Sequence, residues 1–102
     1  MRLEVLHVPD CPNRAVLDLR LHETLADRPD VAIEYHVVRD QADAAQHGMT
    51  GSPTLLVDGV DPFAVPGQAP NLSCRLYLDE HGAVSGAPSV QQLRAALAGV
   101  TP

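Results

Sequence analysis

Cys11 is the residue of this sequence best placed to act as a nucleophile. The stretch HVPDCPNRAV, residues 7–16, joins an apolar run to a segment that resembles a helix start, and Cys11 stands at the junction. A thiol at a helix start meets unpaired backbone N–H groups and the positive end of the helix dipole, which favour the thiolate form. The thiolate attacks disulfides and binds soft metals, so Cys11 is the predicted catalytic residue.

The residue three positions after Cys11 is Arg14, where a Cys-x-x-Cys motif would carry its second sulfur. A dithiol cycle within this motif is therefore excluded. Arg14 lies about one helical turn from Cys11, and its positive charge would also favour the thiolate, so it is predicted to act with Cys11. An ionised Asp10 would oppose this effect. His7 is expected to be a partly buried structural residue, since its strand parity matches that of apolar neighbours.

Cys74 is the candidate second thiol, and the sequence predicts that it is buried. It shares strand parity with two leucines within SCRLYL, residues 73–78. If this run pairs antiparallel with residues 53–57, Cys74 lies at the end of the sheet away from Cys11. If it is an added edge strand, Cys74 lies about 10–15 Å to the side. Since a disulfide needs Cα atoms within about 7 Å, both arrangements argue against direct bonding without movement.

No metal site or cofactor is expected from the pattern of potential ligands. The two cysteines are far apart in sequence, and the histidines lack the paired spacing of a metal site. Four histidines are assigned to surface or partly buried positions: His22, His36, His47 and His81.

Length and charge limit the classes of protein that this chain can represent. Its 102 residues fit a single domain, 1–102, and 45% of them are apolar. The formal net charge of −6 argues against nucleic acid and anionic membranes as partners. The chain shows neither a signal peptide nor the run of about 20 apolar residues that a membrane helix needs. We therefore expect a cytoplasmic protein whose thiols are kept reduced; the oligomeric state is left open.

Hydrophobic periodicity and capping residues predict alternating strands and helices in the order β-α-β-α-β-β-α, an α/β fold with a mixed sheet. The first two strands should be parallel because a helix joins them. Asp40 is the expected cap and Gly48 the expected end of the second helix, and Ser89 the expected cap of the last. Strands are predicted at 2–8, 31–38, 53–57 and 73–78, helices at 12–28, 41–47 and 90–98, and a long loop at 59–72.

The stretch AAQHGMTGSPTLLVDG, residues 44–59, resembles the thioredoxin superfamily, in which a short helix ends in Gly and a Pro-Thr pair opens the next strand. The DCP sequence at residues 10–12 and the C-terminal helix extend the resemblance over nearly the whole chain. It implies a three-layer thioredoxin-like sandwich and a cis Ser52–Pro53 bond. It also implies that Ser52 holds the backbone of a substrate through free N–H and C=O groups, with Pro53 and Pro12 in the same substrate-binding site.

Three functions follow from these observations. The first is a monothiol redox or thiol-transfer protein, in which Cys11 attacks a thiol or disulfide substrate and a second thiol resolves the product. The second is a soft-metal or organomercury protein using Cys11 and Cys74 with Asp10 as the acid, since GSPTLLVDGVDPF and SCRLY also resemble proteins called alkylmercury-lyase-like. The third is a binding module that keeps the fold without turnover.

Overall fold

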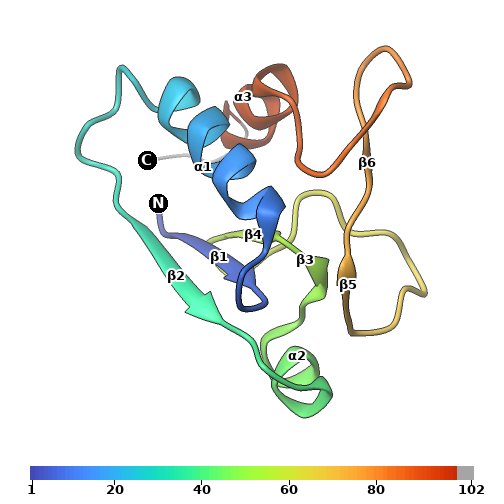
Figure 1. Ribbon diagram of the computed structural model, residues 1–102. Coiled ribbons are helices and arrows are strands. Elements are labelled where there is room, and N and C mark those ends of the chain that lie inside the picture. The colour runs from blue at the N-terminus through green and yellow to red at the C-terminus, as the bar shows by residue number, and fades with distance from the viewer. Residues whose placement is uncertain (99–102) are drawn as a thin grey trace.

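A computed structural model describes residues 1–98 of the chain, which form a compact mixed α/β structure with three helices and small sheets (Figure 1). The helices are α1 (Pro12–Thr24), α2 (Gln41–His47) and α3 (Val90–Ala98). The strands are β1 (Leu3–His7), β2 (Ile33–Val37), β3 (Thr50–Ser52), β4 (Thr54–Val57), β5 (Asn71–Cys74), β6 (Tyr77–Leu78) and β7 (Val84–Ser85). Among these residues, no helix combines the length and apolar character needed to cross a membrane.

The central sheet has the strand order β2-β1-β4. β1 runs parallel to β2, as the intervening helix predicted, and antiparallel to β4, so the sheet is mixed. Side chains from the sheet, α1 and α3 form one core cluster, so the two helices cover the same face (Figure 1). A second, smaller cluster joins the other face to α2 and consists of Leu6, Val38, Ala44, Met49 and Leu56.

The helix caps that were predicted from local sequence are confirmed. The Asp40 side chain accepts a hydrogen bond from the Asp43 N–H at 2.8 Å, and Gly48 ends α2 at a φ of 77°. Ser89 and Gln92 form a reciprocal capping box at the start of α3, with bonds of 3.0 and 3.1 Å. The helix predicted over residues 12–28 is shorter in the structure: α1 ends at Thr24, and residues 25–27 form turns.

The strands after α2 differ from the prediction. A short strand that was not predicted, β3, precedes β4 and pairs in parallel with β5. The single strand predicted over residues 73–78 is instead two strands, β5 and β6, separated by Arg75 and Leu76, and β6 pairs antiparallel with β7. Burial still alternates across the break, since Arg75 is buried in an ion pair and Leu76 is largely exposed, but the chain changes its pairing partner from β3 to β7 there.

Candidate functional site

Cys11 is held at the N-cap position of α1 by a sharp turn. Asp10 has a φ of 57°, in the left-handed region that Asp tolerates better than most residues. Cys11 then adopts an extended backbone, and Pro12 occupies the first helical turn, where a missing N–H costs nothing. The Cys11 side chain makes no capping hydrogen bond and is partly buried. Its sulfur is therefore not used by the helix cap.

Ser52 contacts both segments that carry a cysteine. Its Oγ accepts a hydrogen bond from the Val8 N–H at 3.1 Å, three residues before Cys11. On its other side, Ser52 is the register partner of Cys74 in the β3–β5 pair. Neighbouring strands lie about 4.8 Å apart, so the Cys74 backbone runs directly beside Ser52. The peptide bond between Ser52 and Pro53 is cis, as the resemblance implied.

The predicted role of the Ser52 backbone is corrected by this pairing. The Ser52 carbonyl accepts a hydrogen bond from the Arg75 N–H at 3.0 Å, so it is not free for a substrate. The chain's own β5 occupies the position that was expected for an added substrate strand.

The predicted burial of Cys74 is wrong, because this residue is exposed. The parallel β3–β5 pair rules out the predicted antiparallel pairing with residues 53–57. β5 is instead an added edge strand beside β3, which was the other predicted arrangement, and the sideways distance from Cys74 to Cys11 stays a prediction. Leu76 and Leu78, which were expected to share a buried face with Cys74, are 71% and 64% exposed. Both cysteines are free, and Cys74 is the more exposed of the two.

The Arg14 side chain contacts Tyr35 and Asp18. Its guanidinium lies 4.5 Å from the centre of the Tyr35 ring, and its Nε lies 3.7 Å from an Asp18 carboxylate oxygen. The pKa of Tyr35 is raised to about 12, mainly by burial and to a smaller extent by the hydrogen bond to Asp18 and the negative charge of the Asp18 carboxylate. These contacts account for the position of Arg14 without the Cys11 thiol, and its action on that thiol stays a prediction.

Arg75 is the centre of a buried hydrogen-bond network that was not predicted from the sequence. Its Nη1 donates to Asp61 at 2.6 Å and to the Thr50 and Thr54 hydroxyls at 3.3 Å each. Its Nη2 donates to the Phe63 carbonyl at 2.6 Å. These bonds attach the long loop to β3, β4 and the end of β5. The available sequence signal was a single Arg within an otherwise apolar strand pattern.

Tyr77 continues this centre toward the cis bond. Its hydroxyl donates to the Pro53 carbonyl at 2.6 Å, and the Arg75 guanidinium lies 4.7 Å from the centre of its ring. Phe63 packs edge-on against the same ring. Burial raises the pKa of Tyr77 well above its usual range. The Ser52–Pro53 segment is thus fixed from the side opposite Val8.

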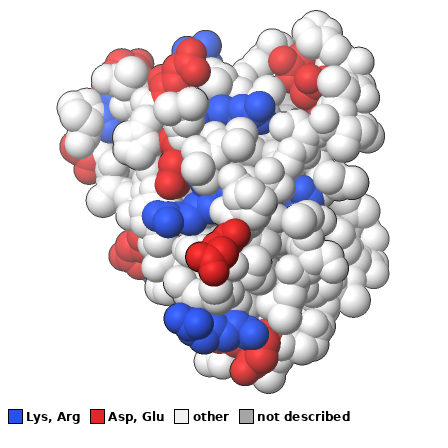
Figure 2. Space-filling view, viewed as in Figure 1, with Lys and Arg blue, Asp and Glu red and all other residues white. Residues whose placement is uncertain are grey.

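A groove of about 630 Å³ opens beside Cys74. The long loop and β5–β6 form its walls, and the lining includes Phe63, Val65, Leu76 and Leu78. In Figure 2, acidic and basic side chains alternate over much of the visible face, but the right-hand side, where β5 and β6 lie in Figure 1, is almost free of charge. The groove therefore suits a ligand with an apolar part.

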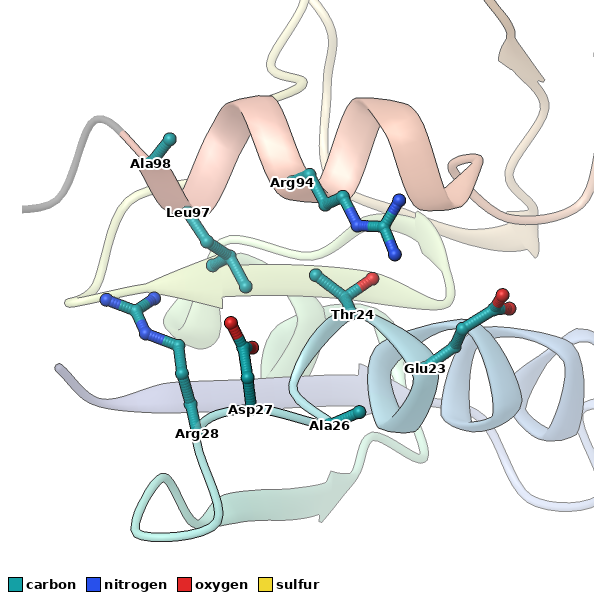
Figure 3. Close-up of a pocket in the computed structure, with 8 residues that line it drawn as sticks. All are labelled: Glu23, Thr24, Ala26, Asp27, Arg28, Arg94, Leu97 and Ala98. Carbon is teal, nitrogen blue, oxygen red and sulfur yellow. The ribbon is translucent and has the colours of Figure 1, made fainter.

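A second hollow of about 610 Å³ lies between the C-terminal parts of α1 and α3 (Figure 3). Glu23, Asp27, Arg28 and Arg94 contribute charges of both signs to it, and no cysteine lines it. Because α1 has 13 residues and rises about 1.5 Å per residue, this hollow lies about 20 Å from the Cys11 end of the helix. It is therefore not part of the thiol site.

Within residues 1–98, a single group of three potential metal ligands has all its ligand atoms within 4.8 Å of one another: Glu4, Glu34 and His36. Asp10, Cys11 and Cys74 do not form such a group. No metal site was predicted from the sequence, although Glu34 and His36 stand two residues apart, as side chains on one face of a strand do.

Comparison of the chain with protein-family models, curated proteins and solved structures found no match.

Proposed function

We propose that this protein is a thioredoxin-like thiol–disulfide exchange protein in which Cys11 is the attacking thiol and Cys74 the resolving thiol. The observation that supports this most strongly is the position of Ser52, which is bonded to the segment before Cys11 and paired in register with Cys74. Cys11 contributes a sulfur that the helix cap does not use, and Cys74 contributes an exposed one.

The exchange proceeds in two displacement steps. The Cys11 thiolate attacks one sulfur of a substrate disulfide, forms a mixed disulfide, and releases the other half of the substrate as a thiolate. The exposed β5 segment then moves so that the Cα atoms of Cys74 and Cys11 come within about 7 Å, and the Cys74 thiolate attacks the Cys11 sulfur. This step releases the second half of the substrate as a thiolate and leaves a Cys11–Cys74 disulfide. The substrate is reduced by two electrons and the protein is oxidised by two. The groove beside Cys74, which has both apolar and polar residues in its lining, would accommodate the non-sulfur part of the substrate.

Reaction of the reduced protein with glutathione disulfide, followed by acid quenching and mass spectrometry, tests this order of events. We expect the wild type to lose two hydrogen masses and to yield a peptide pair joined through Cys11 and Cys74. Cys74→Ser should accumulate a glutathione adduct on Cys11, and Cys11→Ser should form adducts far more slowly. An adduct that forms first on Cys74, or equal rates in the two variants, would contradict the assignment.

The two alternative functions make different predictions in the same experiment. An organomercury-cleaving site needs Asp10, Cys11 and Cys74 close together, and these residues do not form a three-ligand group, so we do not favour it. A binding module without turnover would leave both thiols alkylatable while no internal disulfide forms. That result would refute the exchange function and favour the binding module.

A further inference from the structure

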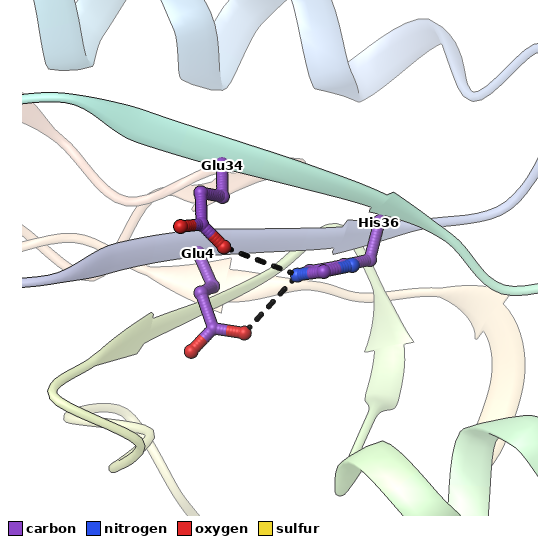
Figure 4. Close-up of side chains that lie close together, drawn as sticks. All are labelled: Glu4, Glu34 and His36. Atoms are coloured by element: carbon purple, nitrogen blue, oxygen red, sulfur yellow. Dashed lines mark ion pairs between the residues drawn. The ribbon is translucent and has the colours of Figure 1, made fainter.

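Glu4, Glu34 and His36 lie on the face of the central sheet opposite α1 and α3 (Figure 4). None of them takes part in the proposed exchange chemistry. Glu4 on β1 and Glu34 on β2 are direct register partners, and His36 follows Glu34 by two residues on the same face. Like charges opposite each other on neighbouring strands are destabilising. Contacts from Arg2 and His36 offset part of this repulsion, and a cation between the two carboxylates would offset it further.

The spacing of the three donors matches the coordination shell of a small divalent ion. His36 Nε2 lies 3.2 Å from Glu4 Oε2 and 3.7 Å from Glu34 Oε2. Donors bound tetrahedrally to Zn²⁺ at 2.0–2.2 Å lie about 3.4 Å from one another. One imidazole and two carboxylates can therefore bind Zn²⁺ with little movement, and the partly exposed site leaves a fourth position for water.

Neighbouring side chains orient two of these donors. The other oxygen of Glu4, Oε1, pairs with Arg2 at 3.0 Å, which leaves Oε2 directed at His36. The His36 ring stacks on the His47 ring with 5.9 Å between their centres. His47 is in turn held by Asp43, whose carboxylate lies 3.0 Å from Nδ1. Metal-binding residues are commonly oriented by such outer partners, which raise their affinity.

We infer that Glu4, Glu34 and His36 form a Zn²⁺-binding site, with Arg2 and His47 as positioning residues. The donors come from two neighbouring strands of one sheet, so a bound ion would also cross-link β1 to β2. The inference does not depend on the proposed thiol chemistry, because it uses neither cysteine.

Calorimetric titration with Zn²⁺, and visible spectroscopy with Co²⁺ as a probe, test the site in a Cys11→Ser/Cys74→Ser background that removes thiol ligands. We expect one ion per chain and an intense tetrahedral Co²⁺ spectrum without a sulfur charge-transfer band. His36→Gln and Glu34→Gln should each lower the affinity by at least about tenfold. Glu34 is largely exposed, so its replacement leaves the fold intact.

His81→Gln is the matched control, because His81 is an exposed histidine outside the cluster. It should bind Zn²⁺ as the background does. His47→Phe should keep most of the affinity by retaining the ring stack, whereas His47→Ala should weaken binding, but by less than His36→Gln does. Absence of saturable Zn²⁺ binding, or an affinity that is the same in His36→Gln and in the background, would overturn the inference.

Discussion

Replacing Arg75 with Met should destabilise the protein more than any other single change of a charged residue in the site. The Arg75 side chain is 4% exposed and its partner Asp61 is 11% exposed, so the ion pair is shielded from water. Met keeps much of the aliphatic stem but removes every donor. The Asp61 carboxylate, the Phe63 carbonyl and two threonine hydroxyls then lose a bonded partner.

The expected loss is about 3–5 kcal/mol, the usual cost of removing one member of a buried ion pair and leaving the other charge uncompensated. A domain of this length has a total unfolding free energy of about 5–15 kcal/mol, so the variant would lose a large fraction of its stability. With a urea dependence of about 1–1.5 kcal/mol per molar, the unfolding midpoint should fall by about 2–5 M.

Urea unfolding followed by circular dichroism measures this change directly. Arg94→Met is the matched control, because Arg94 is exposed on α3 and should change stability by less than about 0.5 kcal/mol. Asp61→Asn and the double variant complete a cycle whose coupling energy should exceed about 0.5 kcal/mol. A loss below about 1 kcal/mol for Arg75→Met, or additive single effects, would refute the view that this pair holds the long loop to β3 and β4.

Three further predictions follow from contacts near the site. Gly51 has a φ of 118°, and a Cβ added there would lie 2.8 Å from the Arg75 Cβ, so Gly51→Ala should lower the free energy of unfolding in urea by more than about 1 kcal/mol. At Gly67 an added Cβ meets nothing within 4 Å, so Gly67→Ala is the control and should lower it by less. Arg14→Ala should leave the alkylation rate of Cys11 unchanged and lower stability by about 0.5–1 kcal/mol through loss of the Tyr35 stack; a clearly slower alkylation would restore Arg14 to the thiol site. The folded state raises the pKa of Tyr35 to about 12, against 10.0 for an ordinary tyrosine, so its contribution to the free energy of unfolding should be fully present below about pH 10 and be lost as the pH rises from 10 to 12. The pKa of Tyr77 is raised as well, so Tyr35→Phe should make the alkaline decline in stability shallower without removing it.

The parts of the fold that the sequence predicted well are those fixed by local interactions. Asp40, Gly48 and Ser89 act within three or four residues of their own positions, so their types alone placed both ends of α2 and the start of α3. The parallel pairing of β1 with β2 followed from the helix between them. The buried position of His7 likewise followed from strand parity and is confirmed.

The pairing of β3 with β5 could not be predicted in the same way. It joins residues about 20 positions apart across a loop rich in Pro and Gly, and each strand is too short to show an alternating pattern. The Glu4–Glu34–His36 group was missed for a related reason. Its members come together only when the register between β1 and β2 is known.

Cys74 was assigned to the wrong face although its strand parity was right. Cys74, Leu76 and Leu78 share one face, as predicted, but that face is exposed, and Arg75 and Tyr77 occupy the buried face. The Arg75 N–H donates to the Ser52 carbonyl, so β5 fills the edge where a substrate strand was expected. For the proposed exchange function, we expect a substrate to approach through the groove beside Cys74 rather than by adding a strand at Ser52. Substitutions in the groove should then affect exchange with bulky disulfides more than with small ones.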